Sequence, residues 1–347
     1  MTPTGAKEVL LVALAAAAVA AGAEEPVALR AEPFTVPPST GPVTHVRVRN
    51  LLGKGYEGAV RLGLPEGWKA EPSERNVNIE PGQTARVPFT VQGGKNLKAN
   101  RYPVTVRAVG GGATVVRKQE IVCASAPYYK PRIDGRLGEW HDAIPVTFAT
   151  KGKKTVVYTY WNPRQFCLAV EVEEDDLEGR SGEEPCDAVQ FAIAPRTAET
   201  GRKAVEKAGR YEFLLTAGTG WFGRDRCFAL IEPGKPLAAA RRQRDLDDLI
   251  VKTARLSIRR RRGVTRYECA IPAKVIRDIR LTVGREIRFS LLVHDPDGTG
   301  LRDLGQAMGL WPSQRNRLAW CTWAGARWGE QPPLDSKIEW GLCSSRR

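Results

Sequence analysis

The stretch TVVYTYWNPRQFCLAVEVEEDDL, residues 155–177, contains the pattern that decides the fold. β-Branched and aromatic side chains fill both of its halves, and these residue types favour extended strands over helices. Asn162 and Pro163 separate the halves, and such a pair is typical of a tight turn. The stretch therefore predicts two antiparallel strands joined by a short turn.

Further strand patterns precede this stretch. Apolar and polar side chains alternate in THVRVRN (44–50), ARVPFTVQ (85–92) and YPVTVRAV (102–109), as they do in half-buried strands. Pro and Gly are plentiful, which suits many short strands joined by turns. We therefore expect an all-β fold of two β-sandwich domains, an immunoglobulin-like one at 26–125 and a second at 127–347.

An arginine-rich hairpin is expected within the second domain. The stretch ARLSIRRRRGVTRYECAIP, residues 254–272, reads as two strands whose turn falls near Arg261–Gly263. Two interpretations of IRRRRG stay open, a patch that binds anionic glycans and an exposed hairpin turn without a ligand.

The first residues have the features of an export signal. An apolar stretch from Val9 to Ala21 follows Lys7 and ends in Ala21-Gly22-Ala23, a pattern that signal peptidases accept. A buried helix is the alternative, but the stretch is uniformly apolar and terminal. We expect a cleaved signal peptide at 1–23, an exported protein that is periplasmic, secreted or at the cell surface, and no membrane span in the mature chain.

The formal net charge of +14 favours polyanionic partners. For an exported protein, an acidic polysaccharide or a membrane surface is a better candidate than nucleic acid. The chain has three histidines and no Gly-x-Ser-x-Gly motif, so we expect no independent catalysis. Cys167 and Cys269 stand inside strand patterns, and we expect both to be small buried residues.

The first predicted domain resembles a known accessory module. LPEGW (64–68), EPGQTARVPFTV (80–91) and a Y-x-V-x-V strand at 102–106 resemble the NEW-type immunoglobulin-like domain found beside α-galactosidases and other secreted glycosidases. The resemblance implies a spacer or docking unit without catalytic groups.

The second predicted domain is similar to family 9 carbohydrate-binding modules, which belong to the DOMON-like group of sandwiches. The likeness rests on the order and spacing of IDGRLGEW (133–140), the strand pair of 155–177, CDAVQF (186–191), YECAIP (267–272) and IRFSLLVHD (287–295). The resemblance implies a non-catalytic, jelly-roll-like sandwich attached to polysaccharide-degrading enzymes. Such a module holds structural Ca²⁺ and grips a sugar, often at a chain end, between two tryptophan rings.

The tryptophans near the C-terminus are the first candidates for sugar-binding rings, because an indole covers the C–H face of a sugar. The resemblance places Trp328 on the loop of one ring, with Trp323 as a substitute. The family's second ring precedes the Asp of the D-x-V-x-F strand, where this chain has Glu183-Glu184-Pro185-Cys186, so Trp221 is the candidate donor. We expect Trp140, Trp161 and Trp320 to lie in the core.

Two acidic segments are candidates for the calcium sites. Asp175 and Asp176 belong to EVEEDDL, and Asp295 and Asp297 belong to DPDGTGLRD. Carboxylates are the hard oxygen ligands that Ca²⁺ prefers, although a solvated turn is the alternative.

We therefore expect an exported, non-enzymatic protein that binds a polysaccharide or a sugar chain end, with an acidic polymer among the candidates. One alternative is a structural or adhesive surface protein that kept the sandwich and lost the sugar site. A further alternative is a haem-binding DOMON-like protein, with Met308 and His294 as the axial ligands.

Overall fold

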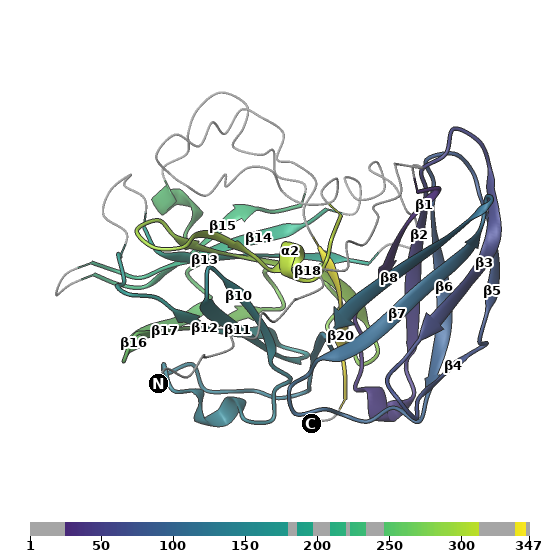
Figure 1. The fold of residues 1–347 in the computed structure, drawn as a ribbon. Coiled ribbons are helices and arrows are strands. Elements are labelled where there is room, and N and C mark those ends of the chain that lie inside the picture. The colour runs from purple at the N-terminus through teal and green to yellow at the C-terminus, as the bar shows by residue number, and fades with distance from the viewer. Residues whose placement is uncertain are drawn as a thin grey trace, which may run out of the picture.

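The computed structural model describes residues 25–179, 186–196, 209–219, 223–233, 246–311 and 337–344. It consists of two β-sandwiches side by side, with few and short helical segments (Figure 1). The all-β fold of two sandwiches expected from the sequence is confirmed. Among the described residues, no helix is long and apolar enough to cross a membrane. The predicted signal peptide at 1–23 lies outside the described residues.

The first sandwich packs two four-stranded sheets against each other. One sheet has the order β1 (Val27–Ala31), β2 (Val43–Asn50), β6 (Thr84–Gln92), β4 (Lys69–Glu71). The other has the order β5 (Arg75–Ile79), β3 (Tyr56–Gly63), β7 (Tyr102–Gly110), β8 (Ala113–Ile121). Burial alternates along β7, where Tyr102, Val104 and Val106 point into the core. This alternation is the one expected for strands with one wet face.

The second sandwich packs a five-stranded sheet against a seven-stranded one. The five-stranded sheet has the order β10 (Val146–Thr150), β11 (Lys153–Asn162), β12 (Gln165–Glu173), β17 (Val264–Pro272), β16 (Arg255–Arg261). The seven-stranded sheet has the order β15 (Arg226–Ile231), β14 (Tyr211–Thr216), β13 (Ala188–Pro195), β18 (Glu286–Asp295), β20 (Ile338–Leu342), β9 (Ser125–Ala126), and β19 (Gly300–Asp303) pairs with β18. The short helical segments are η1 (Pro38–Thr40), η2 (Leu137–Trp140), η4 (Leu246–Leu249) and α2 (Leu304–Ala307).

Tight turns in the second sandwich follow from the residues that the sequence places there. Arg262 and Gly263 join β16 to β17 with φ angles of 53° and 73°, as a type I′ hairpin turn requires. The predicted turn near Arg261–Gly263 is therefore confirmed. Between β11 and β12, the Asn162 side chain accepts a hydrogen bond from the Arg164 amide at 3.0 Å and stabilises the predicted Asn162-Pro163 turn.

Two of the tryptophans expected in the core are buried in the second sandwich. Trp161 lies in the core between the sheets, and its indole N–H donates to the Cys343 carbonyl at 2.9 Å. Trp140, the last residue of η2, lies in a separate small cluster and stacks on Tyr160, with ring centroids 5.0 Å apart. Cys167 and Cys269 are fully buried on β12 and β17, as expected. Trp320 lies outside the described residues.

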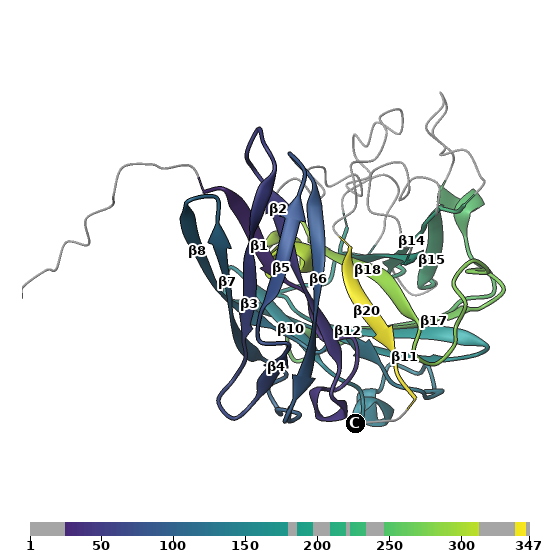
Figure 2. The same cartoon turned by 90° about the vertical axis from the view of Figure 1, so that its right-hand side faces the viewer.

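Strand β20 lies between the two sandwiches (Figure 2). It pairs antiparallel with β18 and parallel with β9, where Gly341 stands opposite Ser125. A Cβ on Gly341 would lie 1.7 Å from the Thr35 carbonyl oxygen, which belongs to the loop after β1. Only glycine therefore permits this close approach of the first sandwich to β20.

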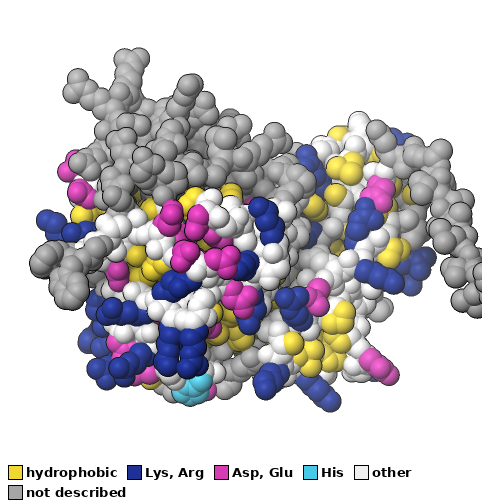
Figure 3. Space-filling model, turned by 60° about the vertical axis from the view of Figure 1, so that its left-hand side comes forward, with side chains coloured by type: hydrophobic (Ala, Val, Ile, Leu, Met, Phe, Trp, Pro, Cys, Tyr) yellow, Lys and Arg dark blue, Asp and Glu magenta, His cyan; other side chains and the backbone are white. Residues whose placement is uncertain are grey.

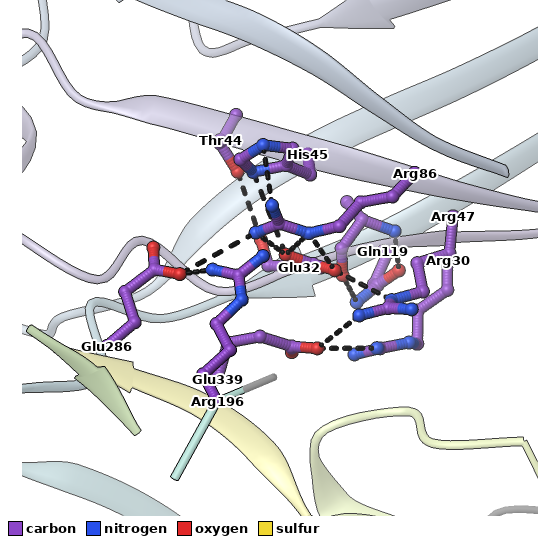
Figure 4. Close-up of polar contacts among 11 residues, drawn as sticks. Arg30, Glu32, Thr44, His45, Arg47, Arg86, Gln119, Arg196, Glu286 and Glu339 are labelled. Carbon is purple, nitrogen blue, oxygen red and sulfur yellow. Dashed lines mark hydrogen bonds and ion pairs between the residues drawn. The ribbon is translucent and has the colours of Figure 1, made fainter. Parts of the chain in front are cut away.

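A cluster of buried charges fills the junction of the two sandwiches (Figure 4). Arg47 donates to Glu32 Oε1 at 2.7 Å and to Glu339 Oε1 at 3.0 Å, so one guanidinium joins β2 to β20. Arg30 on β1 lies 3.5 Å from the same Glu339 oxygen. Burial opposes the charge of Glu339, but the Arg30 and Arg47 guanidiniums outweigh it and lower the pKa of Glu339 to about 2. The junction is thus held by ion pairs between buried arginines and glutamates.

Candidate functional site

One face of the seven-stranded sheet is apolar and the opposite face carries a row of polar side chains. Val189, Phe191 and Ile193 on β13 point into the core. Because side chains alternate along a strand, Gln190 points to the outer face. Pairing of β13 with β14 and β18 brings further outward side chains beside it, among them Glu212, Ser290 and His294.

Hydrogen bonds connect these polar side chains across three strands. The Gln190 side-chain amide donates to Glu212 Oε2 at 3.4 Å, and its carbonyl lies 3.3 Å from His294 Nε2. Arg210 completes the row through an ion pair of 2.7 Å with Glu212. Burial lowers the pKa of His294 to about 4, so its imidazole is neutral at pH 7. The row offers amide, carboxylate and imidazole groups, which can both donate hydrogen bonds and accept them, and its members Gln190, Glu212 and His294 are buried, each with 5% or less of the residue exposed.

Four carboxylates meet where β12 ends, β13 begins and β18 ends. Oxygens of Asp187, Asp295 and Asp297 all lie within 4.8 Å of one another. Glu174, which directly follows β12, is buried, and among the described residues neither of its carboxylate oxygens has a hydrogen-bond partner. Asp187 is fully buried, and its Oδ2 accepts from the Glu178 amide at 2.5 Å, while its Oδ1 finds no hydrogen-bond partner in the described part of the chain. Such a group of unpartnered oxygens is suited to a hard cation.

Burial is the largest cause of the raised pKa values in this cluster, and repulsion between the carboxylates adds to it. Burial, together with the charges of Asp187 and Asp295, raises the pKa of Glu174 to about 8. Burial, together with the charges of Asp297 and Asp295, raises the pKa of Asp187 to about 7. Without a cation, these two side chains therefore hold their protons near neutral pH.

Asp295 is the carboxylate of the cluster that accepts several hydrogen bonds. Its Oδ2 accepts from the Thr299 amide at 2.9 Å, from the Thr299 hydroxyl at 2.7 Å and from Arg302 at 2.5 Å. Burial opposes its charge, but these hydrogen bonds outweigh it and lower the pKa of Asp295. Arg302, on β19, also donates to the Glu173 carbonyl at 2.8 Å, which ties the end of β12 to β19.

The structure brings together only part of the predicted calcium ligands. Asp295 and Asp297 lie in one cluster. Burial and the Asp295 carboxylate raise the pKa of Asp297, and the charge of nearby Asp176 raises it further. Asp175 is exposed and forms an ion pair of 2.5 Å with Lys153. Sequence reasoning missed Asp187 and Glu174 as members of this cluster, although the motif CDAVQF already marked Asp187 as a family position.

The predicted sugar-binding rings, Trp328, Trp323 and Trp221, all lie outside the described residues. Of the proposed haem ligands, Met308 packs against the core between the sheets, whereas His294 lies on the outer face of β18 beside Gln190. The structure therefore does not bring these two side chains to one face of the sheet.

Comparisons with known proteins recover both resemblances. Residues 56–109 match the family model described as the NPCBM-associated, NEW3 domain of alpha-galactosidase. A family 9 carbohydrate-binding module from Caldicellulosiruptor kristjanssonii, solved in complex with glucose, is similar in structure at 11% identity and a TM-score of 0.38, over 63% of this chain and 95% of that chain. A family 9 module from the same organism, in complex with cellotriose, is similar at 12% identity and a TM-score of 0.37, over 64% of this chain and 93% of that chain.

The chaperone YadV is similar at 10% identity and a TM-score of 0.22, over 81% of this chain and 100% of that chain. No curated protein sequence matches the chain. The two resemblances indicated by the sequence motifs, to the α-galactosidase-associated domain and to family 9 modules, are thus confirmed.

Proposed function

We propose that this chain is an exported, non-catalytic carbohydrate-binding protein that recognises a polysaccharide or a sugar chain end and supports polysaccharide degradation. The observation behind this proposal is the polar row of Arg210, Glu212, Gln190 and His294 on the outer face of the seven-stranded sheet. A polar row on one face of a sheet costs desolvation energy, and a hydroxyl-rich ligand would give it further partners. The net charge of +14 favours acidic sugars among such ligands.

Aromatic rings complete this proposed site. Trp328, Trp323 and Trp221 are the side chains we propose to cover the C–H faces of the bound sugar, with the polar row fixing its hydroxyls. Each ring would remove apolar area of the sugar from water, while Gln190 and Glu212 would set its orientation.

Binding to a panel of soluble polysaccharides tests this function. We expect Gln190→Ala to weaken binding about fivefold, because one hydrogen bond to a neutral group is worth about 1 kcal/mol. Trp328→Ala should weaken it about tenfold or more, through lost apolar contact. Tyr128→Ala removes an exposed aromatic ring elsewhere and serves as the control.

Two results would count against the proposal. If the wild type binds no polysaccharide in the panel, the structural or adhesive alternative stands in its place. If binding occurs but Gln190→Ala and Trp328→Ala bind like Tyr128→Ala, the proposed site is wrong even though the function holds.

We further propose that the carboxylate cluster holds a structural Ca²⁺. Asp187, Asp295 and Asp297 would supply oxygen ligands, with Glu174 beside them, and the unpartnered oxygens of Asp187 and Glu174 support this fit. A bound cation would neutralise the repulsion that raises the pKa values of Glu174 and Asp187. It would thereby hold the ends of β12, β13 and β18 together.

A further inference from the structure

The edge strand β16 presents a row of arginines on the outer face of the five-stranded sheet. Leu256 and Ile258 pack into the core, so the odd-numbered residues of this strand face outward. Arg255, Arg259 and Arg261 are therefore on one exposed face, and β16 is the last strand of its sheet. Basic side chains gather at the lower left of Figure 3, the side of the molecule on which Figure 1 places β16 and β17.

Two of these arginines have no partner for their positive charge among the residues that the structure describes. Arg266, opposite Arg259 on β17, is paired with Glu171 at 3.0 Å, and Arg255 donates to Gln165 at 2.8 Å. Among the described residues, the side chains of Arg259 and Arg261 have neither a hydrogen bond nor an ion pair.

The aliphatic stem of the Arg259 side chain is nevertheless held in place by packing. A Cβ on Gly135 would lie 2.3 Å from Arg259 Cγ, so the segment around Gly135 packs directly on the arginine stem. Gly135 is itself held by a hydrogen bond of 2.8 Å from its amide to Glu268. An arginine whose stem is packed loses less side-chain entropy when its guanidinium binds a ligand.

Charged residues on an edge strand also prevent sheets from joining edge to edge. That role requires charge of either sign, whereas arginine is specifically suited to bidentate contacts with carboxylate and sulfate groups. Outward residues two apart on a strand are about 7 Å from each other, so Arg259 and Arg261 can contact successive charges on one extended chain. A change of charge sign at these positions would therefore keep the protection of the edge strand and remove the binding of anionic groups.

We propose that the outer face of the β16–β17 hairpin binds the anionic groups of an acidic polysaccharide through Arg259 and Arg261. This proposal rests on the proposed carbohydrate-binding function and names a substrate class for it. The arginine row is on the five-stranded sheet, whereas the polar row with Gln190 is on the seven-stranded sheet, so the two surfaces are separate. The arginine row would hold the charged polymer while the polar row binds a sugar unit.

The test measures binding of the full chain to fluorescently labelled polygalacturonate, with neutral hydroxyethyl cellulose and polyphosphate as comparisons. We expect Arg259→Glu/Arg261→Glu to weaken polygalacturonate binding at least tenfold at low salt, and Arg259→Lys/Arg261→Lys to weaken it only about threefold. Both variants keep a charged edge strand and should keep the oligomeric state of the wild type. Arg75→Glu/Arg107→Glu changes the net charge equally on exposed arginines of the first sandwich and should bind almost like the wild type.

Other results of this experiment would overturn the inference. An equal loss in the Arg75→Glu/Arg107→Glu variant, or equally tight binding of polyphosphate, would overturn the inference in favour of general attraction by net charge. Binding of the neutral polymer alone would overturn the inference and leave the proposed function intact. If the wild type binds polyphosphate and neither polysaccharide, the proposed function and the inference both fail.

Discussion

Asp187 stands directly before β13, and its carboxylate meets those of Asp295 and Asp297 at the far end of β18. The spacing in DPDG predicts Asp295 and Asp297 together, because both belong to one short turn. Asp187 and Glu174 reach the same place only through the pairing of distant strands, which no local spacing encodes, although the motif CDAVQF contains Asp187. The sequence therefore predicts the proximity of Asp295 and Asp297, but it does not predict that Asp187 and Glu174 join them.

At the scale of single residues, we predict that Ca²⁺ stabilises the protein through Asp187. Saturating Ca²⁺ should raise the melting temperature by about 5 °C over the EDTA-treated protein, because a ligand at 100 times its Kd contributes about 2.7 kcal/mol. In Asp187→Asn the Ca²⁺-dependent rise should disappear, since one of the buried ligands is lost. Differential scanning calorimetry with and without Ca²⁺ measures both.

Asp175→Asn is the matched control, because Asp175 is exposed and pairs with Lys153 outside the cluster of Asp187, Asp295 and Asp297. It should keep the full Ca²⁺-dependent rise. The same rise in Asp187→Asn as in Asp175→Asn would show that the cation binds elsewhere.

At the scale of elements, residue patterns predict the strands well. THVRVRN, expected as a strand at 44–50, lies in β2 (Val43–Asn50), and the hairpin turn of β16 and β17 falls at Arg262-Gly263. What the patterns do not reveal is the partner of each strand. The parallel pairing of β20 with β9 and the contact of Arg47 with Glu339 join residues hundreds of positions apart, and no local periodicity encodes them.

Strand β20 supplies the second prediction through Glu339. Replacing Glu339 with Gln leaves the buried Arg30 and Arg47 guanidiniums without their shared carboxylate. The free energy of unfolding at pH 7 should fall by about 3 kcal/mol, as it does when one partner of a buried ion pair is removed. Urea denaturation measures the change.

The same variant has a defined pH dependence. The pKa of Glu339 is lowered in the folded protein, so its contribution is complete above its usual pKa of 4.5 and is lost as the pH falls towards 2. The stability difference between the wild type and Glu339→Gln should therefore shrink between pH 4.5 and pH 2. Glu120→Gln, which breaks the exposed pair with Arg101, should cost less than about 1 kcal/mol at either pH. A difference that stays constant down to pH 2 would contradict the role given to Glu339.

At the scale of the whole molecule, the buried junction makes the two sandwiches one cooperative unit. Glu32, Arg47 and Glu339 connect β1, β2 and β20, and Gly341 packs against the Thr35 carbonyl. We predict that amides of β6 and of β12 exchange through the same global opening, with equal free energies by hydrogen exchange and mass spectrometry. In Glu339→Gln the two values should separate. Unequal free energies in the wild type would instead show that each sandwich opens alone.

The pairing of β9 with β20 also has a consequence for the order in which the chain is made. Ser125 and its neighbour Gly341 are separated by 216 residues, so β9 leaves the ribosome long before its partner strand has been synthesised. Until then Arg30 and Arg47 have no Glu339 to meet, and the face of the first sandwich that they occupy stays hydrated. A nascent chain of this protein is thus unable to close its junction before β20 has been synthesised.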